Sequence, residues 1–122
     1  METSNAVAAL TALAQENRLE IFRLLVQAGP EGMAAGQVAL SLGLAPNTLT
    51  FHFDRLRFAG LVTVRRNGRS MIYAARFEAM NDLVSFLTEN CCQGAAEACA
   101  PAAVCKPKGA PRHEAVPRAR RR

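Results

Sequence analysis

Four cysteines near the end of the chain are the residues best suited to chemistry: Cys91, Cys92, Cys99 and Cys105. Thiolates are soft ligands that select thiophilic metals and metalloids, and they are also the groups that oxidants attack. In a cytosolic protein such a cluster favours a metal or redox function over structural disulfides. Neighbours on a regular helix point about 100° apart, so Cys91 and Cys92 converge only if the helix ends there, which Gly94 permits. The chain that follows is long enough to bring Cys99 back to Cys91 and Cys92 as a third ligand. Cys105 is a more distant candidate ligand.

A second stretch with chemical potential runs from Ala45 to Arg57 and has one apolar side and one polar side. Leu49, Phe53 and Leu56 recur at helical spacing, so they share a face that belongs in a core. The other side carries groups suited to DNA, since Asn pairs with adenine and Thr or Phe contacts the thymine methyl. The DNA-binding candidates here are Asn47, Thr48, Thr50, Phe51, His52 and Arg55. Of these, the histidine lies at the edge of the apolar face, where it is more often a core residue than a base reader.

The elements that must position these side chains form a helix-turn-helix. The spacing predicts a short helix over Ala35–Leu42, ended by Gly43, and a second helix over Pro46–Ala59. Two helices joined by a tight turn with glycine are typical of proteins whose second helix lies in the DNA major groove. Gln37, on the first of the two helices, is a further DNA-binding candidate.

A β-hairpin is predicted after the second helix. The strands are Leu61–Arg66 and Arg69–Ala75, and the turn between them is Asn67-Gly68, with both turn residues at positive φ. Three arginines bracket its tip and are expected to reach the DNA backbone or minor groove: Arg65, Arg66 and Arg69.

Three further helices complete the predicted fold. The spacing of apolar residues predicts helices over Ala6–Gln15, Arg18–Ala28 and Phe77 to about Asn90, with residues 31–34 as a loop. Asn17 followed by Glu20 resembles a capping box at the start of the second helix. The expected fold class is therefore mainly α with a β-hairpin, in the order of a winged helix-turn-helix.

Composition divides the chain in two. Residues 1–90 contain eight acidic and eight basic side chains, so the whole surplus of +5 lies in 91–122. We therefore expect a DNA-binding and dimerisation domain over 1–90, and a tail over 91–122, rich in Ala, Pro and Arg, that is largely disordered without ligand. No apolar run is long enough to cross a membrane, and the first residues lack the positive start of a signal peptide, which predicts a cytoplasmic protein.

Catalysis is not expected from this sequence. It contains no glycine-rich phosphate loop, and neither of its two histidines lies near a cysteine along the chain. We therefore expect no enzymatic activity and no organic cofactor.

Taken together, residues 10–92 resemble the ArsR/SmtB family of metal-responsive bacterial repressors. The resemblance is carried by Leu13–Leu25, Thr50–Leu56, Ala59–Val62, Gly68–Arg69 and Ile72–Tyr73. It implies a homodimer whose ligand-free form binds a palindromic operator and whose first and last helices make the interface. The interface residues expected on this basis are Val7, Leu10, Phe77, Met80, Leu83, Val84 and Leu87.

Within that family the chain is most similar to the arsenic-responsive subgroup with C-terminal cysteines. The helix over Pro46–Ala59 contains no cysteine, and the last helix contains no histidine, which distinguishes the chain from other arsenic repressors and from zinc sensors. The resemblance implies that trivalent arsenic, or antimony, is the inducer, held by the thiolates of Cys91, Cys92 and Cys99, with Cys105 as a substitute ligand. Two alternatives remain open: zinc or cadmium bound by four thiolates, and thiol-based redox sensing.

Overall fold

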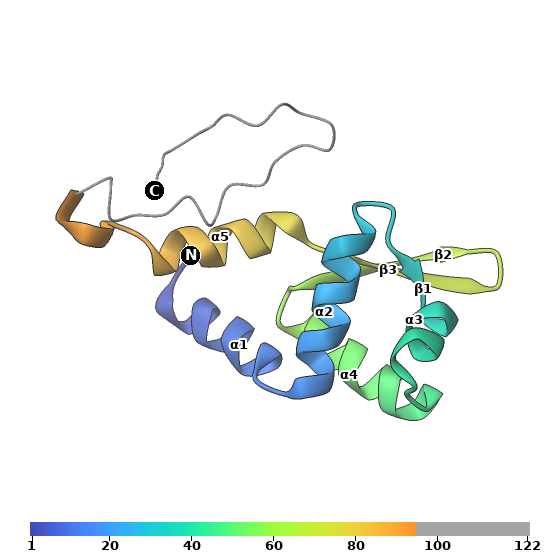
Figure 1. The fold of residues 1–122 in the computed structure, drawn as a ribbon. Helices are drawn as coiled ribbons and strands as arrows, with labels where there is room; N and C mark the ends of the chain where they lie inside the picture. Colours follow the sequence, from blue (N-terminus) through green and yellow to red (C-terminus); the bar gives the residue numbers. More distant parts are fainter. Residues whose placement is uncertain (95–122) are drawn as a thin grey trace. The chain divides into compact units, whose positions relative to one another are not determined.

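Residues 1–94 are the part of the chain that the computed structural model describes, and they form helices and a small sheet (Figure 1). The elements are α1 (Thr3–Leu13), α2 (Glu16–Ala28), β1 (Met33–Ala34), α3 (Ala35–Leu42), α4 (Pro46–Phe58), β2 (Val62–Asn67), β3 (Ser70–Ala75), α5 (Phe77–Leu87) and the 3₁₀ helix η1 (Cys91–Gly94). The predicted class, mainly α with a β-hairpin in winged helix-turn-helix order, is confirmed.

The core lies where α2, α3 and α4 meet the sheet. α2 contributes Ile21 and Leu25, both with no exposed surface, and α4 contributes Leu56, which is equally buried. These side chains follow the helical spacing of the apolar residues, so burial selects one face of each helix. α1 contacts both α2 and α4, while the β2–β3 hairpin extends past the helices (Figure 1).

The hairpin turn lies one residue later than the sequence predicts. Asn67 pairs with Ser70, so the two-residue loop is Gly68-Arg69, and only Gly68, at φ 65°, has positive φ. One positive φ at the first loop position is typical of a type II′ turn. The predicted turn would have placed Arg66 opposite Arg69, and like charges directly opposite each other are destabilising. The observed register instead pairs Arg66 with Met71.

Other local predictions were wrong as well, among them the first helix, which runs over Thr3–Leu13 instead of Ala6–Gln15. The predicted loop over residues 31–34 includes strand β1, which makes the sheet three-stranded by pairing Met33 with Tyr73 of β3. α2 starts at Glu16 rather than Arg18, and Gln15, instead of Asn17, caps it by accepting a hydrogen bond from the backbone N–H of Arg18 at 3.0 Å. The last helix ends at Leu87, before the expected Asn90.

Gly32 fixes the approach of β1 to β3, and its replacement by alanine is expected to destabilise the fold strongly. Its φ is +78°, and an added Cβ would collide with the carbonyl oxygen of Tyr73. Gly43, at φ +66° with open space around it, is the matched control. We expect the free energy of unfolding in urea to fall by about 1 kcal/mol for Gly43→Ala. For Gly32→Ala the loss should be larger by a further 1–3 kcal/mol or so, because the strand pair must also shift. Equal losses would contradict this reading.

Met1–Leu83 forms one compact unit, and the described residues from Val84 to Gly94 fall outside it. The predicted tail lies almost entirely outside the described residues, so the division into 1–90 and 91–122 stays a prediction. None of the helices in the described part is long and apolar enough to span a membrane.

Candidate functional site

Helix α4 has one face buried in the core and one exposed. Leu49, Phe53 and Leu56 are buried, as predicted, and the Phe53 ring stacks on Tyr73 of β3 with ring centroids 3.6 Å apart and planes at 2°. Burying a phenylalanine contributes about 1.5–3 kcal/mol, so this contact fixes the rotation of α4 about its axis. Burial also raises the pKa of the Tyr73 phenol. The orientation of the opposite face is therefore set by the core.

The exposed face of α4 begins at an uncapped helix N-terminus. Ala45 is the N-cap and offers no side-chain hydrogen bond, and Pro46 occupies the first turn. Asn47 and Thr48 are exposed in that turn, where backbone N–H groups and the helix dipole favour a phosphate. The Thr50 hydroxyl donates a hydrogen bond to the carbonyl oxygen of Pro46 at 3.0 Å, which leaves its methyl group and lone pairs for an outside partner.

Further along the same face, an aromatic ring and a guanidinium group lie together. Phe51 is 51% exposed, and the guanidinium carbon of Arg55 lies 5.0 Å from its ring centroid. That distance is typical of a cation–π contact. Gln37 of the preceding helix α3 is also exposed. The structure thus exposes every predicted DNA-binding residue of the helix-turn-helix except His52.

His52 was included among the DNA-binding candidates, although its place at the edge of the apolar face favoured a core residue, and its side chain is only 6% exposed. Its Nδ1 lies 3.4 Å from Nη1 of Arg18, a residue of α2 whose Nε donates a hydrogen bond to the Ala12 carbonyl oxygen. Burial, and then the positive charge of Arg18, lower the pKa of His52 from its ordinary value of 6.5. The side chain therefore belongs to the core edge and does not face a groove.

The lowered pKa of His52 predicts a loss of stability in acid. A group whose pKa is depressed in the folded state binds protons more readily when unfolded, so its stabilising contribution is lost as pH falls. We expect the urea midpoint to fall between about pH 7.5 and 5.5, and His52→Gln to reduce that fall. His113→Gln is the matched control, since it removes the only other histidine. If the urea midpoint depends on pH equally in the parent and in both variants, His52 does not cause the loss of stability in acid.

The hairpin carries the second set of predicted DNA contacts. Arg65 and Arg66 on β2 and Arg69 in the turn are all exposed. Adjacent strand residues point to opposite faces, so the side chains of Arg65 and Arg66 lie on opposite faces of the hairpin. Nε of Arg66 donates to the carbonyl oxygen of Gly68 at 3.3 Å, which holds this guanidinium near the tip.

Two of the four cysteines fall in the described part of the chain. Cys91 and Cys92 open η1, and Asn90, Cys92 and Gln93 have positive φ, so the backbone there departs from a regular helix. Cys92 is exposed and Cys91 is half-buried. Cys99 and Cys105 lie outside the described residues, and within 1–94 no three His, Cys, Asp or Glu side chains gather as a metal site. The predicted ligand set is therefore untested.

The predicted dimer-interface residues differ in exposure. α1 buries Ala6, Ala9 and Ala12 and exposes Val7 and Leu10 at 53% and 43%. Leu87 is 59% exposed, whereas Leu83 is only 6% exposed. The remaining candidates are half-buried: Phe77, Met80 and Val84. The exposed members of this set are thus Val7 and Leu10 on α1 and Leu87 on α5.

Known proteins similar to this chain are regulators of transcription. A family model described as a helix-turn-helix domain matches residues 13–65. The HTH-type transcriptional regulator YgaV of Escherichia coli K12 is 30% identical over 87 residues, which cover 71% of this chain and 86% of YgaV.

Solved structures agree with that match. An ArsR-like transcriptional regulator from Rhodococcus sp. RHA1 superposes with a TM-score of 0.61 at 26% identity, covering 69% of this chain and 76% of its own. The homodimeric winged helix-turn-helix DNA-binding domain of Mb0332 from Mycobacterium bovis superposes with a TM-score of 0.58 at 28% identity, covering 71% and 81%.

Proposed function

This chain belongs to the ArsR family of winged helix-turn-helix transcriptional regulators, and on that premise we propose that it is a homodimeric repressor released from a palindromic operator by trivalent arsenic. The observation that carries the DNA-binding part is the division of α4, whose stacked Phe53 turns a row of polar side chains outward. The part that concerns arsenic rests on the thiols that follow α5.

On DNA, α4 lies in the major groove and the hairpin on the backbone. Asn47, Thr48 and Thr50 supply sequence preference, because amide and hydroxyl groups read base edges. The hairpin arginines supply affinity that depends on salt, because they replace counterions on the phosphates. The exposure of both sets of side chains supports these separate roles in sequence preference and affinity.

Two copies of the chain bind one operator. A single winged domain reads one half-site, and a two-fold dimer matches a palindrome. The homodimeric state of Mb0332 supports the same arrangement here. So does the exposure of Val7 and Leu10 on α1, since burying such side chains between copies is favourable.

Trivalent arsenic binds the thiolates of Cys91, Cys92 and Cys99. A soft ion selects soft ligands, and the first two residues provide two such donors side by side. The positive φ of Cys92 supports the proposal, because adjacent side chains on an irregular turn are not held to the 100° separation of a helix. Antimony, which shares this preference for thiolates, is the expected second inducer.

Arsenic lowers operator affinity only if it binds the DNA-incompetent conformation more tightly, because equal affinity for both states shifts nothing. A typical coupling of about 1–3 kcal/mol corresponds to a 5–150-fold loss of affinity. We expect a change of that size when arsenite is added to the reduced protein bound to a palindromic fragment selected from random DNA.

Serine replacement at each cysteine tests the arsenic site. Serine preserves size but removes the soft donor, so the variants at 91, 92 and 99 should remain bound to DNA in arsenite. The Cys105→Ser variant should be released like the parent and is the matched control. If the Cys99 variant responds and the Cys105 variant does not, the third ligand is Cys105. If all four respond normally, arsenic does not act through these thiols.

Parallel titrations separate the alternatives. Release by zinc or cadmium, with no response to arsenite, would indicate a four-thiolate metal site. Release by peroxide, accompanied by a disulfide or sulfenic acid in the mass spectrum, would indicate redox sensing, which the exposed thiol of Cys92 permits.

A further inference from the structure

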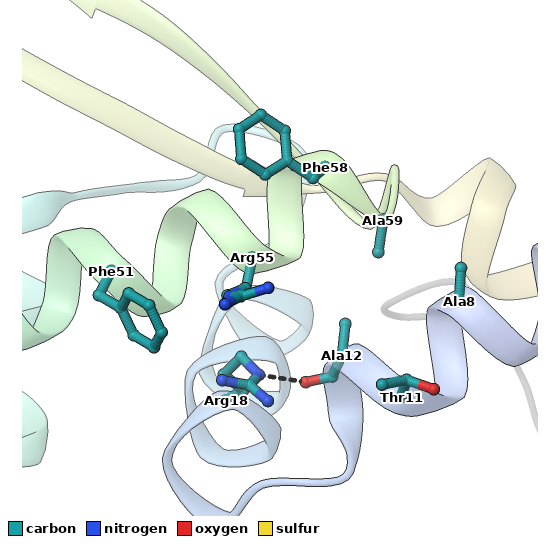
Figure 2. A pocket seen from close by; sticks show the side chains of 8 residues that line it. All are labelled: Ala8, Thr11, Ala12, Arg18, Phe51, Arg55, Phe58 and Ala59. Atoms are coloured by element: carbon teal, nitrogen blue, oxygen red, sulfur yellow. Dashed lines mark hydrogen bonds between the residues drawn. The ribbon is translucent and has the colours of Figure 1, made fainter.

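A groove between α1 and α4 contains two cationic groups and two exposed rings that the proposed function leaves without a common partner (Figure 2). It has a volume of about 460 Å³. Its lining residues are Ala8, Thr11, Ala12, Arg18, Phe51, Arg55, Phe58 and Ala59. Pockets of about 300–1,000 Å³ are typical of small-molecule sites.

The two arginines of the groove lack compensating charge. The ion pairs within residues 1–94 are Arg57 with Asp54 and Arg76 with Glu78, so neither Arg18 nor Arg55 has a carboxylate partner there. A carbonyl oxygen, that of Ala12, fixes the Arg18 guanidinium in place (Figure 2). A neutral acceptor orients a cation without neutralising its charge. The groove therefore keeps a positive charge that can bind an anion.

The aromatic side chains of the groove indicate that the ligand also has an apolar part. Phe58 is 81% exposed and Phe51 is 51% exposed, and both rings border the groove. The α1 wall opposite them carries only small side chains, Ala8, Thr11 and Ala12, which leaves room for a flat apolar body. A ligand with a ring would bury these two phenylalanines, while an acidic group on it would meet the arginines.

We propose that the groove between α1 and α4 binds a small aromatic carboxylate, with its ring against Phe51 and Phe58 and its carboxylate on Arg18 and Arg55. A guanidinium group presents paired N–H donors that match the geometry of a carboxylate. A concave site of this size suits one or two fused rings.

A regulatory consequence follows, and it rests on the proposed function. Phe51 and Arg55 also belong to the face of α4 that is proposed to meet DNA. A ligand held in the groove therefore competes with the operator for these two side chains. The binding test below uses the protein without DNA, so its failure is distinguishable from failure of the repressor proposal.

Fluorescence titration with 2-naphthoate tests the site, because the chain has no tryptophan and one tyrosine, which leaves the naphthalene emission clear. We expect saturable binding by the full chain. Arg55→Gln and Phe58→Ala should each raise the Kd roughly tenfold or more, as expected for losing a charge-assisted hydrogen bond or a ring contact. Both residues are exposed, so neither replacement disturbs the core.

Matched controls come from neighbouring surface. Arg57→Gln removes an exposed arginine of α4 that does not line the groove, and Leu40→Ala removes an apolar side chain that is 82% exposed on α3. Both should leave the Kd within about twofold of the parent. 2-Naphthamide, which has the same ring but no charge, should bind at least roughly tenfold more weakly than the acid.

Four results would overturn the proposal. They are the absence of saturable binding up to millimolar 2-naphthoate, equal binding of the amide, an unchanged Kd in both groove variants, and conversion of the homodimer to monomers by Phe58→Ala. The last would make the exposed ring a contact between copies of the chain. Weaker operator binding by Arg55→Gln, without any naphthoate binding, would assign the groove to DNA phosphates instead.

Discussion

Replacement of Leu10 by aspartate is expected to yield monomers and to lower affinity for a full palindromic site by roughly a thousandfold or more. Leu10 is 43% exposed on α1, so the change introduces a charge at the proposed interface without entering the core. Specific DNA complexes of dimers have dissociation constants of about 10⁻⁸ to 10⁻¹¹ M, and a monomer keeps only the contacts of one half-site. Sedimentation and DNA titration measure the two effects separately.

Leu19→Asp provides the matched control. Leu19 is 44% exposed on α2, so the same charge enters at the same degree of exposure on another helix. It should remain dimeric and retain operator affinity. If Leu10→Asp stays dimeric at micromolar concentration, the α1 face is not the interface. If it dissociates yet binds the full site unchanged, the chain does not use two half-sites together.

Leu83 would have been a poorer choice for this experiment. The sequence groups it with Phe77, Met80 and Leu87 because all four fall on one stripe of α5. Periodicity identifies a face but not which of its residues are covered within a single chain. Leu83 is 6% exposed and Leu87 is 59% exposed, so aspartate at 83 would unfold the protein through an uncompensated buried charge.

Most of the fold followed from apolar spacing and glycine positions, whereas the errors arose where tertiary contacts decide. The turn at Asn67-Gly68 matched a strong local signal, but the strand register depends on what lies opposite each residue. Strand β1 was not predicted because a segment of two residues is too short to show a periodic pattern. Met33-Ala34 forms a strand only because it pairs with β3.

The candidate site divides in the same way. The polar face of α4 was predictable because Leu49 and Phe53 fix its opposite side. The place of His52 at the edge of the core followed from the same spacing, whereas its contact with Arg18, thirty-four residues earlier in the chain, did not. The groove was likewise invisible to sequence reasoning, because its lining comes from three helices and shares no motif.

Removing the three hairpin arginines together is expected to weaken operator binding by roughly 10²–10³-fold near 0.1 M salt. Each phosphate contact contributes a slope of about 0.9 to the dependence of log affinity on log salt, so three contacts contribute about 2.7. The exposed positions of Arg65, Arg66 and Arg69 allow replacement by alanine without a cost to the core. Titration of the parent and triple variant at several salt concentrations gives the difference in slope directly.

A charge-matched control separates position from net charge. Replacing Arg120, Arg121 and Arg122 by alanine also removes three positive charges from the chain, whose formal net charge is +5. If placement on the hairpin matters, this variant should keep most of the salt slope and most of the affinity. Equal flattening in both variants would mean that the protein attracts DNA through its overall charge. We expect the first outcome, because residues 1–90 carry no net charge, so that specific binding must depend on where the arginines lie and not on how many there are.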